Sequence, residues 1–241
     1  MLQLKPDRLG HEEFRSQPVA VCGKAFLADM SGALFWPAER ALIVADLHLE
    51  KGSAFASRGQ MLPPYDTRET LQRLTEVIDF YRAETVIALG DSFHDVGGPG
   101  RMQPDDLAML RLMQDHCEWI WIAGNHDPHI DVSSLGGHVR PSLDVEGLTL
   151  RHEPGPGRTT HEIAGHLHPA ARVALNGYAM RRPCFIGNGL RLVLPAFGSY
   201  AGGLNVLDAA FAPLFDGEGM AVWLLGQEGL YPVATRLLRE D

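Results

Sequence analysis

Short apolar runs that end in polar, chemically active residues are the main pattern along this chain. Runs rich in Val, Ile, Leu and Ala, bounded by Gly and polar residues, are typical of strands buried on both faces. Five such runs lead directly into Asp, His, Asn or a Gly beside them: residues 41–45, 85–89, 119–123, 148–150 and 163–164. Open α/β sheets bind ligands outside the carboxyl ends of their strands, so we expect these polar side chains to converge.

Two segments between the runs have the spacing of amphipathic helices. Residues 66–83 carry apolar side chains at Leu71, Leu74, Val77, Ile78 and Tyr81. This segment opens with Asp66 and Glu69, three residues apart, a pattern typical of a capping box. The second predicted helix covers residues 104–116, with Pro104 in its first turn and Leu107, Leu110 and Met113 on one face.

The remaining segments give weaker predictions. Residues 52–65 show no clean period, which favours a loop that covers part of the site. Residues 190–194, 205–208 and 219–225 are predicted as strands, and residues 197–203 as a Gly-rich turn.

Length and composition favour one enzyme domain spanning residues 1–241. The chain has 241 residues and is 45% hydrophobic, enough for a sizeable core. No apolar run reaches the roughly 18 residues of a membrane span, and the N-terminus lacks the apolar centre of a signal peptide, so we expect a cytoplasmic protein with no membrane contact. Cys22, Cys117 and Cys184 lack metal-type spacing and are expected to be reduced structural residues.

The charge balance restricts the partners. A net charge of −9 argues against a general binder of duplex DNA, which would gain affinity from Lys and Arg. Residues 138–200 nevertheless hold seven arginines, including Arg158 and Arg191, against four acidic residues. That excess fits a local basic rim or scattered, solvated arginines equally well.

The polar residues after the runs are typical ligands of hard divalent cations. They comprise Asp46, His48, Asp91, Asn125, His152, His166 and His168. Ions such as Mn²⁺ accept carboxylate and imidazole together, and the carboxylate of Asp91 could bridge two ions. Each residue alone has a simpler explanation, since an Asp after a strand is often a turn former and a lone His is often structural. The ordered set favours ligation.

These motifs resemble those of the calcineurin-like metallophosphoesterases. The family signature is matched by Asp46-x-His48, Gly90-Asp91, Gly124-Asn125-His126-Asp127, His152 and Gly165-His166-x-His168. The resemblance implies a four-layer αββα sandwich of two mixed sheets flanked by helices. It also implies one metal at Asp46, His48, Asp91 and His168, and a second at Asp91, Asn125, His152 and His166. His126 would be the catalytic histidine free of metal, oriented by Asp127.

A narrower resemblance extends over most of the chain. Residues 46–74 and 90–95, and the later Pro195-Ala196-Phe197-Gly198 and residues 202–205, look like the bacterial ligase-associated DNA damage response endonucleases, the PdeM family. This implies two Mn²⁺ ions and attack of a metal-activated hydroxide on a phosphodiester. It further implies DNA, single-stranded in particular, as the substrate in repair, with a DNA ligase or helicase as a partner. A homo-oligomer remains open.

Other residues and functions are less clearly indicated. His94, Arg58 and Lys51 are candidate substrate contacts. A supporting role explains His94 equally well, and solvation is the simpler explanation for Arg58 and Lys51. Tyr200 and Phe197 could stack on a base, although packing is the simpler use. His11, His116, His129, His138 and His161 are expected to be structural or exposed. A phosphomonoesterase or nucleotide phosphatase would need the same ligands, so it stays an alternative. A lipid-precursor pyrophosphatase is less favoured, because the sequence has no basic amphipathic segment that would bind a membrane. A module that only binds a ligase or helicase would not need a complete set of ligands.

Overall fold

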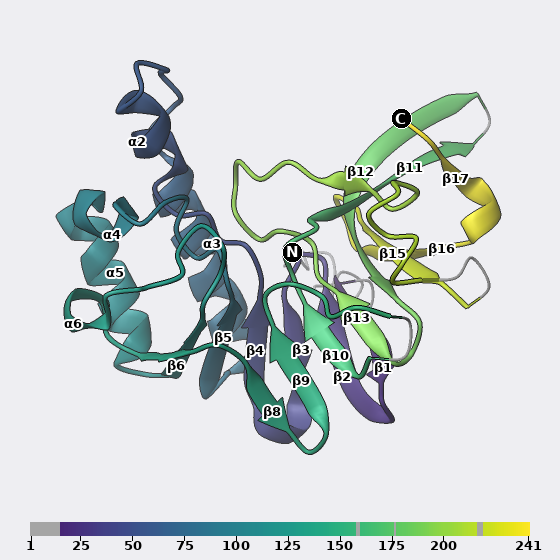
Figure 1. The fold of residues 1–241 in the computed structure, drawn as a ribbon, viewed down its shortest axis with the longest axis horizontal. Helices are drawn as coiled ribbons and strands as arrows, with labels where there is room; N and C mark the ends of the chain where they lie inside the picture. The colour runs from purple at the N-terminus through teal and green to yellow at the C-terminus, as the bar shows by residue number, and fades with distance from the viewer. Residues whose placement is uncertain (1–14, 158–159, 176, 216–218) are drawn as a thin grey trace, which may run out of the picture.

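Two mixed β-sheets pack face to face, and helices cover the outer face of the first sheet (Figure 1). The computed structural model describes residues 15–157, 160–175, 177–215 and 219–241, so His11 and Arg158 lie outside the described residues. The first sheet has the order β1-β2-β3-β4-β5-β6-β7. Its strands are β1 (Ser16–Val21), β2 (Lys24–Asp29), β3 (Leu34–Trp36), β4 (Ala41–Val44), β5 (Thr85–Leu89), β6 (Glu118–Ile122) and β7 (His138–Arg140).

The second sheet is built from the C-terminal half of the described chain. Its main path runs β14-β11-β12-β13-β10-β9-β8, with β15 and β16 added at β12 and β17 at β11. The strands are β8 (Leu143–Val145), β9 (Leu148–Arg151), β10 (Glu162–Ala164), β11 (Pro169–Leu175), β12 (Tyr178–Gly187), β13 (Arg191–Val193), β14 (Leu204–Asn205), β15 (Ala221–Leu225), β16 (Leu230–Val233) and β17 (Leu238–Arg239).

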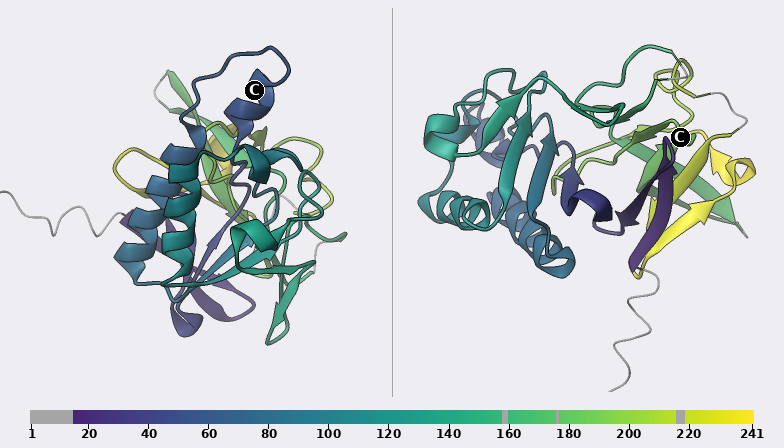
Figure 2. Two further views of the ribbon diagram at one scale, coloured as in Figure 1. Left: turned by 90° about the vertical axis from the view of Figure 1, so that its left-hand side faces the viewer. Right: turned by 90° about the horizontal axis from the view of Figure 1, so that it is seen from below.

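The helices lie on the side of the first sheet that faces away from the second (Figure 2). They are α2 (Lys51–Ala56), α3 (Asp66–Tyr81), α4 (Gly98–Arg101), α5 (Pro104–Gln114) and α6 (Val132–Leu135), with short 3-10 turns η1 (Pro37–Glu39) and η2 (Thr235–Leu237) elsewhere. Helices α3 and α5 lie side by side, and α2 lies beyond the start of α3 (Figure 2). Leu71, Leu74 and Val77 on α3 are buried against the sheet. Within the described residues, no helix is long and apolar enough to cross a membrane.

Three apolar cores hold the layers together. One lies between the helices and the first sheet and contains Trp119 and Trp121. Another lies between the sheets, where Ile43 and Ile87 meet Phe185 and Leu192. The third covers the outer face of the second sheet, where residues 206–215 fold over it as a series of turns. The layered α/β sandwich of two mixed sheets expected from the sequence is therefore confirmed.

The site is organised by the parallel parts of both sheets. Strands β4, β5, β6 and β7 run parallel in the first sheet, and β9, β10 and β13 run parallel in the second. All four residues of β4 are buried, which explains its uninterrupted apolar sequence. All five predicted runs form strands, so their carboxyl ends supply the polar residues as expected.

The loop predicted at residues 52–65 is partly wrong, because α2 occupies Lys51–Ala56. Long-range contacts hold this helix against the start of α3: the Gly52 amide donates to Asp66 Oδ2 at 3.0 Å, and the Glu50 amide donates to Thr67 Oγ1 at 2.8 Å. Asp66 is consequently the first residue of α3 rather than its cap, and no side chain caps that end. The capping-box prediction is therefore wrong.

Two further expectations need correction. The strand predicted at residues 205–208 ends at Asn205, because its side-chain oxygen accepts the Leu207 amide at 3.1 Å and closes a turn. Arg191, counted among possible surface arginines, is fully buried. The three cysteines are free, as expected, with Cys117 and Cys184 buried.

Candidate metal centre

The predicted ligands converge at the carboxyl ends of the strands in two groups of side chains. Among the described residues, Asp46, His48 and His168 form one group, and Asp91, His152 and His166 form the other. In each group one potential ligand atom per residue lies within 4.8 Å of the others. Residues from both sheets contribute to each group, so the packing of the two sheets builds the site.

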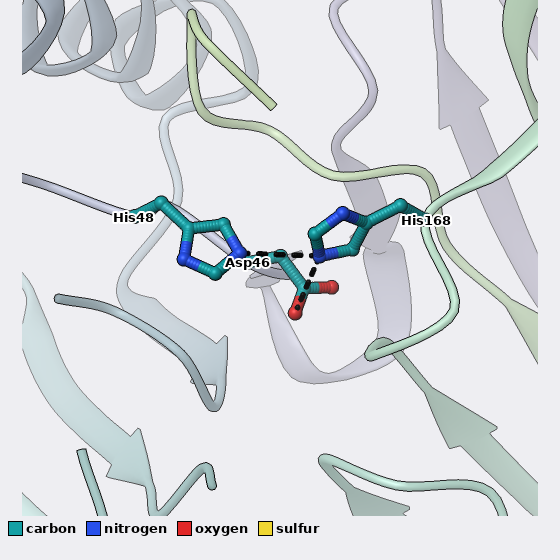
Figure 3. A group of neighbouring side chains, drawn as sticks. All are labelled: Asp46, His48 and His168. Carbon is teal, nitrogen blue, oxygen red and sulfur yellow. Dashed lines mark hydrogen bonds and ion pairs between the residues drawn. The ribbon is translucent and has the colours of Figure 1, made fainter. Parts of the chain in front are cut away.

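The first group joins the segment after β4 to the segment before β11 (Figure 3). The Nε2 atoms of His48 and His168 face each other at 3.2 Å. Asp46 Oδ1 lies 3.2 Å from His168 Nε2. Asp46 and His48, two residues apart, thus point to one place, as the sequence predicts.

The second group is centred on His152. Its Nε2 atom lies 2.8 Å from Asn125 Oδ1, 3.1 Å from His166 Nδ1 and 3.4 Å from Asp91 Oδ2. Its Nδ1 atom lies 2.9 Å from the carbonyl of Leu89. Ligand histidines commonly donate the second ring N–H to a carbonyl in this way, which leaves Nε2 free for a metal.

The donor set fits divalent cations. Asp46 is fully buried, and its Oδ1 atom has no hydrogen-bond partner among the described residues. Leaving a buried carboxylate oxygen unpaired is costly unless a cation pairs with it. Ligand atoms bound at about 2.1 Å and at right angles to one another lie about 3 Å apart, close to the separations within both groups. Aspartate, imidazole and one amide oxygen suit Mn²⁺ or a related ion.

The pKa values of His48 in the first group and His152 in the second shift in opposite directions. Burial lowers the pKa of His48 to about 4, a larger effect than the opposing charge of Asp46. Burial disfavours charge on His152 too, but its hydrogen bond to Asp91 and the charges of Asp46 and Asp91 raise its pKa to about 9. The same contacts overcome burial at Asp91 and lower its pKa to about 2. The protein therefore favours the charged form of His152 in the second group and the neutral form of His48 in the first.

Most of these ligand candidates have an uncommon backbone conformation. Asp46, His48, Asp91, His166 and His168 have φ values of 54°, 43°, 45°, 70° and 45°. Residues other than glycine rarely adopt positive φ, and such residues cluster at functional sites where the surrounding structure maintains them. The strands thus end in turns that aim the side chains inward at an energetic cost.

Two motif glycines make room for ligands of other motifs. A Cβ atom on Gly124 would lie 2.2 Å from the Asp91 amide nitrogen and 2.3 Å from its Oδ1. A Cβ atom on Gly165 would lie 2.6 Å from Asp46 Oδ2. Neither position tolerates a side chain without moving a carboxylate, so these glycines belong to the site although they bind nothing.

His126 lies beside both groups with one ring nitrogen free. Its Nδ1 atom is 2.9 Å from the carbonyl of His94, and its Nε2 atom is 4.0 Å from Asp91 Oδ2. The rings of His94 and His126 stack with centroids 5.4 Å apart. His94, an uncertain candidate in the sequence, is thus a direct neighbour of His126.

The expectation that Asp127 orients His126 is not met by these contacts. Asp127 is buried, and its oxygens accept the amides of Phe93 and Gly124 at 3.0 and 3.1 Å. Burial raises its pKa to about 6. Asp127 therefore holds the two ligand loops together, while the carbonyl of His94 contacts His126. Sequence patterns cannot reveal this role, because any residue can supply a backbone carbonyl.

The remaining candidates have varied surroundings. Arg58 is exposed, and its charge contributes to lowering the pKa of His94, after burial and Lys51. Lys51 Nζ donates to the Tyr200 carbonyl at 3.0 Å, and the Tyr200 hydroxyl donates to Pro63. Phe197 is buried, so packing is its use. The other described histidines are exposed, as expected: His116, His129, His138 and His161.

The motifs and geometry agree with a match to a known family. The sequence model of the family described as "Calcineurin-like phosphoesterase" matches residues 39–178, more than half of the chain. The chain belongs to the calcineurin-like phosphoesterase family. This family uses divalent metals, consistent with the two groups of ligands.

One solved structure resembles nearly the whole chain. The nuclease MPE of Pseudomonas putida is 32% identical, with a TM-score of 0.69, and the similarity covers 90% of this chain and 100% of that one. This full-length relationship supports assignment to a hydrolase family and extends beyond the matched motif region.

Other structural similarities are weaker. The phosphoesterase Yfce of E. coli is 15% identical over 81% of this chain and 98% of its own, with a TM-score of 0.41. The protein AQ665 of Aquifex aeolicus is 16% identical over 53% of this chain and 78% of its own, with a TM-score of 0.38. Neither carries an argument here. No curated protein matches the sequence.

Proposed function

We propose that this protein is a metal-dependent phosphodiesterase that cuts DNA, single-stranded DNA in particular, during DNA repair. Two ions, Mn²⁺ by preference, would occupy the two groups of ligands. The protein would work in the cytoplasm, as one domain, beside a DNA ligase or helicase. The similarity over 90% of the chain to a nuclease, at 32% identity, carries the proposal.

The residues present would hold the ions in two overlapping sets. Asp46, His48 and His168 would bind one ion, and Asn125, His152 and His166 the other, with Asp91 shared. Bound divalent ions would lower the pKa of a water and stabilise negative charge on the phosphodiester. His126 belongs to neither set and lies beside them, so it is free to act as a proton donor.

His126 would transfer a proton at Nε2. Its Nδ1 atom contacts the His94 carbonyl, so Nδ1 carries a hydrogen. The doubly protonated imidazolium has a second proton on Nε2, and donating that proton to the leaving oxygen returns the ring to its neutral Nδ1–H form. The side chain is 41% exposed, which allows a substrate to reach it. His94 stacks on His126 and would keep its ring in place. A proton donor of this kind is worth about 10²–10⁴ in rate.

The test of the activity uses circular single-stranded DNA and a simple phosphate monoester. Metal-stripped protein would be assayed on both with and without Mn²⁺, with Asn125→Ala as the control variant. A circle has no ends, so only an endonuclease can linearise it. Linearisation that needs Mn²⁺ and fails in Asn125→Ala supports the proposal. Cleavage of the monoester with an intact circle would instead support a nucleotide or small-molecule phosphatase, which the net charge of −9 favours.

The test of the proton donor uses His126→Ala. We expect this variant to bind the same amount of Mn²⁺ as the wild type, because His126 belongs to neither ligand group. We expect DNA cleavage to fall by about 10²–10⁴-fold. Unchanged cleavage by the fully loaded variant would remove His126 from the mechanism.

A further inference from the structure

Three arginines lie side by side on the hairpin of β11 and β12 and on β17. Arg172 on β11 is paired in register with Arg181 on β12 and with Arg239 on β17. Directly paired residues of antiparallel strands point to the same face of the sheet. The three guanidinium groups, here called the arginine row, therefore share one face, and like charges placed opposite one another destabilise a sheet.

The protein orients the arginine row but neutralises little of its charge. Arg172 Nη1 donates to the Glu240 carbonyl at 2.8 Å, and Arg239 Nη1 donates to the carbonyls of Arg236 and Leu238. Arg181 donates to the Gly203 carbonyl at 2.6 Å and pairs with Asp241 Oδ1 at 3.0 Å. Asp241 is 53% exposed, and such exposed pairs contribute little. Asp241 and Glu240 lie beside the row, so three arginines against two acidic residues leave a small positive excess in a chain with net charge −9.

The face that carries the row continues from the candidate metal centre. Arg181, Pro183 and Phe185 occupy every second position of β12, so their side chains point to the same face of the sheet. Phe185 lies in the core between the sheets, and the row therefore lies on the inner face. His168 directly precedes β11, and at about 3.3 Å per residue Arg172 lies about 13 Å further along the strand. The row is thus a short distance from a predicted metal ligand.

Two hollows adjoin the row, and one of them also reaches the centre. A pocket of about 170 Å³ is lined by His168 together with Arg181, Ala170 and Pro183. A second, of about 600 Å³, is lined by Arg172 and Arg239 and by the neighbouring small residues Ala174 and Ala179. Small side chains leave the guanidinium groups accessible to a chain passing over the sheet.

We propose that the arginine row binds backbone phosphates of the DNA strand, two or more nucleotides from the phosphate that is cut. This inference rests on the proposed function. Phosphate oxygens suit guanidinium groups that are already oriented, and the three arginines span about 10 Å, two strand spacings. The bound strand would run from the metal centre through the small pocket and over the row.

The test compares a long and a short substrate of the same site. The variant Arg172→Gln/Arg181→Gln/Arg239→Gln would be assayed with Mn²⁺ on a 20-nucleotide single strand and on bis(p-nitrophenyl) phosphate, a diester too small to reach the row. We expect kcat/KM on the oligonucleotide to fall at least tenfold and that on the small diester to stay within twofold. The slope of log(kcat/KM) against log[salt] should become shallower by about 2, since each lost phosphate contact contributes about 0.7.

Matched variants separate binding from folding. Arg111→Gln removes one exposed charge from α5, where Arg111 also contacts a backbone carbonyl, and should change neither substrate's kcat/KM. The single change Arg172→Gln removes the central charge, so the melting temperature should not fall while oligonucleotide cleavage does. This single variant keeps the test informative if the triple variant does not fold.

The outcomes distinguish the two proposals. Wild-type protein that hydrolyses the small diester but never the oligonucleotide would contradict the proposed function. If the wild type cuts the oligonucleotide and the triple and single variants have the same kcat/KM and salt slope as the wild type, only the proposed role of the arginine row would be contradicted. Loss of both activities in the folded single variant would also overturn it, because the row would then act on the metal centre itself.

Discussion

Two buried charged clusters in this protein have opposite designs. One is the ion pair of Glu162 and Arg191, both fully buried on the neighbouring strands β10 and β13. The other is the first ligand group, in which the Asp46 carboxylate faces the imidazoles of His48 and His168. Both place charge in the interior, where an unpaired charge is costly.

Each guanidinium nitrogen of Arg191 and each carboxylate oxygen of Glu162 has a hydrogen-bond partner. Arg191 Nε donates to Glu162 Oε1 at 2.5 Å, and its other nitrogens donate to the carbonyls of Gly155, Gly157 and Leu214. The Gly155 amide donates to both oxygens of Glu162 at 3.0 Å. These bonds connect the loop after β9 to β10 and β13, and to the turns of residues 206–215 on the outer face of the second sheet. The pair is therefore part of the framework.

The ligand group lacks this closure. Asp46 Oδ1 has no hydrogen-bond partner in the described part of the chain, and the Nε2 atoms of His48 and His168 both point toward it from 3.2 Å apart. Burial of charge alone therefore does not identify a site. Incomplete pairing together with strained backbone does, because the missing partner must come from outside the chain.

Breaking the ion pair should have the largest effect on stability. Arg191→Met leaves Glu162 buried without its charge partner, so we expect the free energy of unfolding to fall by about 3–5 kcal/mol, measured by urea denaturation. The double variant Arg191→Met/Glu162→Gln should recover part of this loss, since it removes the unpaired charge. Equal stability of the wild type and Arg191→Met would show that the pair is not structural.

Filling the ligand groups should have the next largest effect, with the opposite sign. A ligand that binds only the folded state at 100 times its Kd raises the free energy of unfolding by about 2.7 kcal/mol. We therefore expect Mn²⁺ to raise the melting temperature of the metal-stripped protein, and EDTA to reverse this. Asn125→Ala should show a smaller rise, while an equal rise in that variant would place the bound ions elsewhere.

Neutralising Asp46 should change the free energy of unfolding less, and in the opposite direction from breaking the Glu162–Arg191 pair. In the metal-stripped protein, Asp46→Asn removes a buried charge whose Oδ1 atom faces imidazole rings but accepts no hydrogen bond among the described residues, so the free energy of unfolding should stay equal or rise by about 1 kcal/mol. The same variant should lose the stabilisation by Mn²⁺. A loss of several kcal/mol without metal would mean that Asp46 is structural, like Glu162.

The sequence predicts the two clusters very unequally. The ligands follow apolar strands in a recognisable order, so Asp46, Asp91 and His152 could be proposed from local pattern and family resemblance. Glu162 and Arg191 gave no such signal, because each sits in a stretch that also suits an exposed charge. Their pairing depends on the register of β10 against β13, which only the assembled sheet defines.

The same distinction explains the errors in the fold. Strands such as β4 and helices such as α3 were predictable because their burial patterns are local. Helix α2 was not, since side chains from the start of α3 hold it in place. The contacts of Asp127 were not predictable for a related reason, as its partners are backbone amides brought together by folding.

The smallest expected effect belongs to the outermost member of the framework cluster. Arg151 Nη1 lies 3.9 Å from Glu162 Oε2, and its side chain is 40% exposed, so water screens the interaction. Arg151→Met should lower the free energy of unfolding by less than about 1 kcal/mol in urea denaturation, because Glu162 keeps Arg191 as its partner. A loss as large as that of Arg191→Met would show that Glu162 depends on both arginines, and the contrast between a closed pair and an open ligand group would then have to include a third charge.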